Sequence, residues 1–261
     1  MRTTGGLGLA MLFVATVAGA QPVTTAVGYD NVHIRTLDPA KAAEWYVTAL
    51  GAKMSVPPAA GTAQVTFGSH VVTLTKGATI EPSLGTAIDH IGLSYGDLDA
   101  AVRKAEAAGA TVTSPPRESP GIFRYAYIVD PWGTRIEMVE DTEQLGFHHV
   151  HLRTMNPDTT LSWFQHKLGG ERTKLRGKLD GIRFGGVWVF AMSSGAETPP
   201  PATAIQLVAV RVEDVDASVK QLNGAGVKTL TEPRSVPALR YAFLEGPNGI
   251  RVEVVKRLMA P

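Results

Sequence analysis

The sequence contains no cysteine, which excludes disulfide bonds, thiol catalysis and thiolate metal ligands. It also lacks an excess of charge, because 25 basic side chains stand against 24 acidic ones and the formal net charge is only +1. Such a balance gives no broad positive field for nucleic acid or anionic lipid. We therefore expect no nucleic-acid partner, and any metal must bind through nitrogen and oxygen atoms.

The first 20 residues have the pattern of a cleaved secretory signal. Arg2 precedes the apolar run LGLAMLFVATVA, and the small residues Ala18, Gly19 and Ala20 precede Gln21 as in a signal-peptidase site. The apolar run is too short to span a bilayer as a helix. We expect a mature chain that begins at Gln21, is periplasmic or secreted, and has no membrane span; a buried N-terminal helix is the alternative.

The rest of the chain is an internal repeat. Trp45 and Leu50 in the first half recur at the same spacing as Trp163 and Leu168 in the second half. A fainter repeat divides each half again, which gives four units of about 55 residues.

Each unit predicts the element order βαβββ. An alternating strand leads to a capping residue, an amphipathic helix, a glycine stop and further short alternating segments. The capping residues are Asp38, Asp97, Asn156 and Asp214, and the glycines are Gly51, Gly109, Gly169 and Gly226. The predicted fold class is α+β, with two domains of two units each at residues 27–141 and 146–257.

Histidines gather in the third unit. In GFHHVHLRT, residues 146–154, alternation places His149, His151 and Arg153 on one face of the strand. The first unit has a similar strand, YDNVHIRT at 29–36, with His33 and Arg35 on the corresponding face.

The second unit places two more ligand types on the equivalent face. His90 stands opposite the apolar face of its strand, and in GTRIEMVE the side chains of Arg135 and Glu137 face away from the apolar pair Ile136 and Met138. Such faces line a polar cavity if the sheets are curved. If the sheets are not curved, these faces are exposed to bulk water.

These features resemble the vicinal oxygen chelate superfamily, which includes glyoxalase I, extradiol dioxygenases and bleomycin-resistance proteins. The resemblance covers nearly all of residues 28–256 and depends on the paired units, on AAEWYVTALGA at 42–52, on DHIGLSYGDLDAAV at 89–102 and on DPWGTRIEMVE at 130–140. It implies curved mixed sheets that form two glyoxalase-like domains around a divalent metal. By position it also implies His90, Glu137 and His149 as metal ligands, with Glu137 as the candidate catalytic residue.

Two imidazoles and one carboxylate suit Zn²⁺, Fe²⁺, Mn²⁺, Ni²⁺ or Co²⁺ and leave open positions for substrate oxygens. The substrate pocket is expected to include His151, and arginines on the same faces could hold an anionic substrate by charge-assisted hydrogen bonds. These arginines are Arg35, Arg135 and Arg153. Their alternative reading is as solvated surface residues.

The pairing of the four units decides the ligand set. If the units pair within each half, His90 and Glu137 meet only Asn31 or His33, and His33 becomes the alternate ligand. If the two middle units pair instead, His149 joins His90 and Glu137, while the outer units form a degenerate site. The short linker at 140–146 allows both arrangements.

Two function classes follow from these observations. The first is a metal-dependent lyase, isomerase or dioxygenase that acts on a small oxygenated, possibly anionic, molecule. The second is a metal-free protein that sequesters a ligand, of the bleomycin-resistance kind. A tight cluster of His and Glu favours the enzyme, an aromatic cavity without ligands favours the binder, and either is compatible with a monomer or a homodimer.

Overall fold

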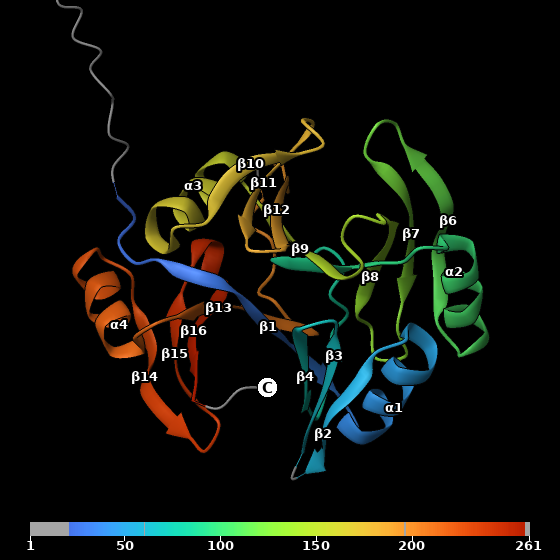
Figure 1. Ribbon diagram of the computed structural model, residues 1–261, viewed down its shortest axis with the longest axis horizontal. Coiled ribbons are helices and arrows are strands. Elements are labelled where there is room, and N and C mark those ends of the chain that lie inside the picture. Colours follow the sequence, from blue (N-terminus) through green and yellow to red (C-terminus); the bar gives the residue numbers. More distant parts are fainter. Residues whose placement is uncertain (1–20, 60, 196, 259–261) are drawn as a thin grey trace, which may run out of the picture.

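The computed structural model describes residues 21–59, 61–195 and 197–258. The expected signal segment, residues 1–20, lies outside the described residues. Four consecutive units each have the order βαβββ, which confirms the predicted α+β class (Figure 1).

The bounds of the elements follow the four units. The first unit contains β1 (Ala26–Thr36), α1 (Pro39–Leu50), β2 (Lys53–Ala59), β3 (Thr62–Phe67) and β4 (His70–Lys76). The second contains β5 (Ile88–Ser94), α2 (Leu98–Ala107), β6 (Thr111–Ser119), β7 (Phe123–Val129) and β8 (Arg135–Glu140). The third contains β9 (Gly146–Thr154), α3 (Pro157–Leu168), β10 (Glu171–Leu175), β11 (Leu179–Phe184) and β12 (Val187–Ser193). The fourth contains β13 (Ile205–Val212), α4 (Val215–Gly224), β14 (Thr229–Val236), β15 (Leu239–Glu245), a 3₁₀ turn η1 (Pro247–Gly249) and β16 (Arg251–Arg257).

The helices begin at the predicted capping residues, whereas only two of the four end at the predicted glycine, because the C-caps of α2 and α4 are Ala108 and Ala225, one residue before Gly109 and Gly226. A side-chain oxygen of each capping residue accepts a hydrogen bond from a backbone N–H in the first helical turn. The helices α1 and α3 end at Gly51 and Gly169, whose φ angles of 77° and 74° lie in the left-handed region that favours glycine.

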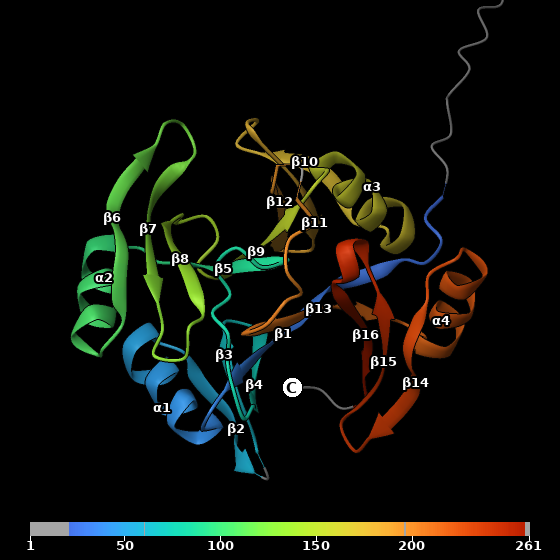
Figure 2. The same ribbon diagram turned by 180° about the vertical axis from the view of Figure 1, so that it is seen from behind.

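The strands form two eight-stranded mixed sheets, and each sheet combines units from different halves of the chain. The outer-unit sheet joins the first and fourth units in the order β14-β15-β16-β13-β1-β4-β3-β2. The middle-unit sheet joins the second and third in the order β10-β11-β12-β9-β5-β8-β7-β6. Antiparallel pairs β1–β13 and β5–β9 hold the units together at the centre of each sheet (Figures 1 and 2).

The helices keep to their own halves of the chain. In both views α1 lies beside α2, and α3 lies beside α4 on the opposite side of the molecule (Figures 1 and 2). Trp45 Nε1 on α1 donates to the carbonyl of Ala108 after α2 at 2.7 Å. Lys167 Nζ on α3 donates to the carbonyl of Ala225 after α4 at 2.9 Å. The two helices of each half therefore contact each other, whereas each sheet contains strands from both halves.

One apolar core fills the helix-packed faces of both sheets. Ile91, Ile136 and Val150 are completely buried there, which confirms the predicted apolar faces of β5 and β8. The opposite faces of the same strands carry His90, Glu137 and the histidines of β9. In the described part of the chain, no helix is both long and apolar enough to cross a membrane.

Candidate metal centre

The centre of the middle-unit sheet brings four ligand side chains together. The antiparallel β5–β9 register sets His90 opposite His151 and Gly92 opposite His149. The parallel β5–β8 register sets Gly92 beside Glu137. Gly92 therefore stands between the Glu and the His contributed by the two neighbouring strands.

Glu137 is the hub of the cluster. Its Oε2 lies 3.0 Å from His90 Nε2 and 3.1 Å from His149 Nε2. One donor atom from each of His90, Glu137, His149 and His151 lies within 4.8 Å of all the others. The first three side chains are buried, and His151 is partly exposed toward solvent.

Gly92 makes the room for this cluster. A Cβ atom at this position would lie 2.1 Å from the Nδ1 and Cε1 atoms of His149, a distance that side chains do not tolerate. A glycine inside a strand weakens the strand but permits such a close approach. The imidazole of His149 occupies the space that any other residue at position 92 would fill.

A carboxylate orients His90. The Nδ1–H of His90 donates to Asp89 Oδ1 at 2.7 Å, and the Gly85 amide donates to Asp89 Oδ2 at 2.8 Å. Arg135 also donates to Asp89. This arrangement fixes the tautomer that leaves Nε2 of His90 free to bind a metal.

A second chain of hydrogen bonds orients His149. His148 Nδ1 lies 2.8 Å from His149 Nδ1, and His148 Nε2 lies 3.4 Å from Asp141 Oδ2. If both imidazoles are neutral, one proton placement satisfies both contacts: His149 donates to His148, and His148 donates to Asp141. Nε2 of His149 is then unprotonated, and its lone pair is directed at Glu137 and His90. Arg176 Nη2 donates to the other carboxylate oxygen of Asp141, Oδ1, at 2.9 Å.

Strict alternation could not reveal these orienting residues, because it places Asp89 and His148 on the opposite face from the ligands. The β5–β9 ladder is interrupted twice, and the extra residue is Asp89 in one strand and His148 in the other. Such β-bulges turn a side chain out of its expected face. The only signal in the sequence was the neighbour immediately before each ligand histidine.

Burial and hydrogen bonding favour the protonation state of a metal ligand at three of the four side chains, Glu137, His149 and His151. Burial lowers the pKa of His149 to about 4 and lowers the pKa of His151 well below its usual value. Burial alone would raise the pKa of Glu137, but its contacts with His149 and His90 hold that pKa well below the usual range. For His90, burial would lower the pKa, but hydrogen bonds to Asp89 and Glu137 outweigh it and raise the pKa, so a cation bound here would displace a proton from this imidazole.

A cavity of about 140 Å³ opens over the cluster. Glu137, His149 and His151 form its base. Its walls are Ser119, Ile122, Phe123, Tyr125, Tyr127, Leu179 and Phe190. The ring of Tyr127 lies 5.3 Å from the ring of His90. The walls are therefore mainly aromatic and apolar, and lysine and arginine are absent from the residues that form them.

The structure places the candidate arginines away from this cavity lining. Arg135 donates to Asp89, and its guanidinium stacks 3.8 Å above the centroid of the Tyr127 ring. Arg35 lies in the outer-unit sheet and lines a different cavity of about 180 Å³. Arg153 is a partly buried residue of β9 that does not line the 140 Å³ cavity.

The alternate ligand His33 lies in the outer-unit sheet. Its Nε2 is 3.6 Å from Glu253 Oε2, so it belongs to the equivalent position of the other sheet. His33 and His151 occupy corresponding places, opposite Leu207 and His90 respectively. The structure thus groups His149, and not His33, with His90 and Glu137.

The donor set fits one divalent cation. Nitrogen and oxygen ligands lie about 2.0–2.2 Å from such an ion, so ligands on opposite sides stand at most about 4.4 Å apart. The spread of 4.8 Å among the four donors is close to that limit. Neutral imidazoles and one carboxylate suit Zn²⁺, Fe²⁺, Mn²⁺, Ni²⁺ or Co²⁺.

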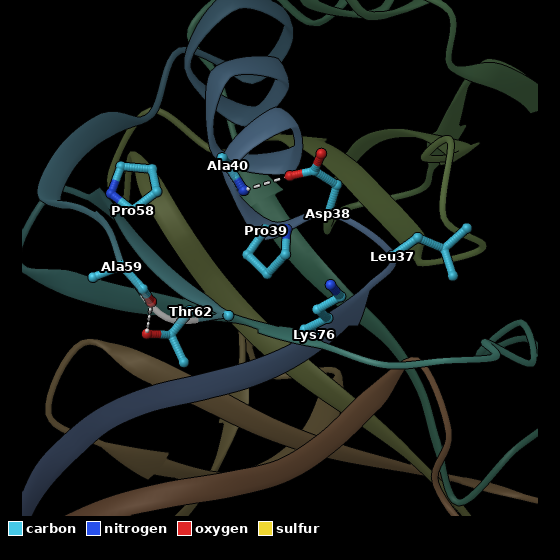
Figure 3. Close-up of a pocket in the computed structure, with 9 residues that line it drawn as sticks. Leu37, Asp38, Pro39, Ala40, Pro58, Ala59, Thr62 and Lys76 are labelled. Atoms are coloured by element: carbon cyan, nitrogen blue, oxygen red, sulfur yellow. Dashed lines mark hydrogen bonds between the residues drawn. The ribbon is translucent and has the colours of Figure 1, made fainter.

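A larger depression, of about 330 Å³, lies at the start of α1 and has no comparable chemistry (Figure 3). Asp38 there already accepts a hydrogen bond from the Ala40 amide, so the helix terminus is capped by the protein itself. Cavity volume alone therefore does not locate the reactive site.

Comparisons with known proteins agree with this fold. Residues 28–138 and 146–254 match the family model described as Glyoxalase/Bleomycin resistance protein/Dioxygenase superfamily. Glyoxalase I from Zea mays has a similar structure, with a TM-score of 0.75 and 19% identity over 88% of this chain and 92% of that chain. A candidate dioxygenase from Bacillus subtilis subsp. subtilis strain 168 has a TM-score of 0.68 and 17% identity over 91% of this chain and 87% of that chain. The search among curated proteins found no match.

Proposed function

Because the chain belongs to the Glyoxalase/Bleomycin resistance protein/Dioxygenase superfamily, we propose that it is a divalent-metal-dependent lyase, isomerase or dioxygenase. Its substrate is a small oxygenated molecule. One observation supports this proposal above the others: four ligand side chains converge beside a cavity that three of them line, and both buried histidines among them have orienting partners.

His90, Glu137 and His149 hold the cation. Asp89 and the His148–Asp141 pair keep the two imidazoles aligned, and such outer partners typically contribute 10- to 100-fold to metal affinity or activity. When bound, the cation supplies Lewis-acid polarisation of the substrate oxygens.

His151 is the histidine of the cluster that has no orienting hydrogen bond among the described residues. Its Nδ1 is buried and has no hydrogen-bond partner among the described residues. No partner therefore fixes its tautomer, and the neutral imidazole either completes the ligand set or accepts a proton from substrate. Glu137, the only carboxylate of the cluster, is the second candidate base.

The cavity limits the substrate. Its volume of about 140 Å³ is below the roughly 300–1,000 Å³ of sites for drug-sized ligands. A divalent cation with one ionised carboxylate and neutral imidazoles leaves a single net positive charge, which favours an anionic oxygen. Since the walls are aromatic, the substrate has an apolar body, and its charge is balanced at the metal rather than by arginine.

Elemental analysis of the purified protein tests the metal. We expect about one divalent ion per chain, and loss of that ion in His90→Ala and Glu137→Gln. Glu253→Gln, which changes the corresponding carboxylate of the other sheet, is the matched control and should keep the ion. Full metal content in the His90→Ala, Glu137→Gln double variant would place the ion elsewhere.

Activity assays then separate the reaction classes. Oxygen uptake with catechol tests for a dioxygenase. Rearrangement of the hemithioacetal that methylglyoxal forms with a thiol tests for an isomerase or lyase. Each assay is run with the metal-free protein and after addition of one metal at a time. Turnover that does not depend on metal would contradict the proposal.

The aromatic cavity walls support a second candidate, a metal-free protein that sequesters a small ligand. Tyr125, Tyr127 and Phe190 provide stacking surfaces that such a binder uses. Metal content decides between the two, because a binder of this kind would be purified without a stoichiometric ion and would show no metal-dependent turnover.

We also propose that the chain is exported and begins at Gln21 after processing. The support is the apolar run followed by Ala18, Gly19 and Ala20. Intact-mass measurement on protein from the native host tests this processing, and a retained Met1 would contradict the proposal.

A further inference from the structure

The outer-unit sheet has a second cavity at the position that corresponds to the metal cluster. It has a volume of about 200 Å³ and is formed by β1, β3, β4, β14, β15 and β16. Glu253 on β16 takes the place of Glu137, and His33 takes the place of His151. Two of the four ligand positions have lost their imidazole, because Asn31 stands for His149 and Leu207 for His90.

The cavity has an unpaired acceptor at its base. Asn31 is only 4% exposed, and its Nδ2 donates to Asp30 Oδ1 at 2.9 Å and to Glu253 Oε2 at 3.2 Å. Turning the amide over would set its oxygen against these two carboxylates, so the network fixes the orientation. Asn31 Oδ1 is left buried and without a partner among the described residues. A buried acceptor without a donor destabilises the folded protein, and a ligand that donates to it removes this cost.

A pair of charged residues holds this amide in place. Arg257 donates twice to Asp30, from Nε at 2.9 Å and from Nη2 at 2.8 Å. The β1–β13 ladder is interrupted between Tyr29 and Val32, and Asp30 precedes Asn31 there as His148 precedes His149 at the bulge of β9. The sheet therefore supports the amide with an Asp–Arg pair where the metal cluster uses a His–Asp pair.

The rest of the lining is partly apolar and aromatic. Val236, Leu239, Tyr241 and Phe243 line the cavity together with the polar side chains of Gln64 and Thr73. The guanidinium of Arg251 lies 5.3 Å from the centroid of the Phe243 ring, so Tyr241 is the aromatic ring of the lining that has no cation over it among the described residues. Carboxylate and aromatic faces together recognise an organic cation, by a charge-assisted hydrogen bond and by cation–π attraction.

We propose that this cavity binds a small organic ammonium ion, whose N–H groups donate to Asn31 Oδ1 and to the Glu253 carboxylate and whose apolar body contacts Tyr241 and Phe243. The site goes beyond the proposed metal-dependent activity and does not depend on it. An anion fits less well, because two guanidinium nitrogens of Arg257 already donate to Asp30 and burial keeps His33 neutral, with its pKa lowered to about 4.

Titration with n-butylamine tests the proposal, with the full chain followed by NMR chemical-shift changes at pH 8. We expect saturable binding that shifts residues around Asn31 and Glu253, at least tenfold tighter than 1-butanol or butyrate. Glu253→Gln should weaken the amine at least tenfold, and Val236→Trp, which fills the entrance, should abolish binding. Glu137→Gln is the matched control in the other sheet, and it should leave the affinity unchanged.

Several results would overturn the proposal. These are equal affinity of wild type and Glu253→Gln for butylamine, tighter binding of butyrate or 1-butanol, or loss of amine binding in Glu137→Gln. The last result would mean that the amine coordinates the metal in the middle-unit sheet. Because Val236 is 44% exposed, its variant should remain folded and gives a second test if Glu253→Gln does not fold.

Discussion

Glu137 and Glu253 occupy the same place in the two sheets, but their pKa values are shifted in opposite directions. Contacts with two imidazoles keep the pKa of Glu137 low although its side chain is buried. Burial raises the pKa of Glu253 to about 7, and the single amide donor of Asn31 only partly offsets this effect. The residue opposite each carboxylate therefore decides whether it is an ionised ligand or a weak acid.

The acidity of Glu253 predicts how stability depends on pH. Its folded-state pKa of about 7 lies above the unfolded value of 4.5, so its contribution is complete below pH 4.5 and is lost as pH rises through 7. From pH 5 to pH 8, wild type should lose about 2.5 kcal/mol more unfolding free energy than Glu253→Gln. Urea denaturation at both pH values measures the difference. Parallel pH profiles would contradict the assignment.

At the scale of strands, β5 and β9 combine two bulges with one glycine to build the cluster. The bulges turn Asp89 and His148 behind the ligand histidines, and Gly92 leaves room for the His149 ring. These departures from regular pairing weaken the ladder locally, and they occur where the ligands lie.

Gly92→Ala should therefore displace His149 and lower metal affinity at least tenfold. The new methyl group would meet the imidazole at 2.1 Å, and overpacking of this kind typically costs about 1–3 kcal/mol of stability. Metal titration and thermal unfolding measure the two effects. Gly96→Ala is the control, because a Cβ there has nothing within 4 Å. Unchanged metal affinity in Gly92→Ala would show that His149 is not a ligand.

At the scale of the whole molecule, each sheet needs both halves of the chain. His90 and Glu137 come from the first half, whereas His149 and His151 come from the second. The helix pairs α1–α2 and α3–α4 stay within their halves, so the molecule is interlocked rather than divided at the linker between β8 and β9.

Separate production of residues 21–142 and 143–258 should give fragments that hold no stoichiometric metal. Mixing the fragments should restore about one ion per pair, because only then does the β5–β9 pairing form. Elemental analysis after gel filtration measures this. Stoichiometric metal in the first fragment alone would show that His149 is dispensable.

The sequence by itself determined the local elements and the ligand candidates. Capping residues such as Asp38, glycine stops such as Gly51 and two-residue alternation in β9 act over a few neighbouring residues, so the pattern of each unit can be read without its partners. The same alternation assigned His90, Glu137 and His149 to the faces on which the structure has them.

Only the tertiary structure decided which units pair. Both pairings use the same strands with the same apolar faces, and the choice depends on contacts between segments far apart in the chain, such as β5 with β9 and β1 with β13. That choice joins His149 to His90 and leaves His33 with Glu253. It also turns Arg135 onto Asp89 and leaves Asn31 with an unpaired oxygen, since bulges and burial arise from packing and not from the alternation of one strand.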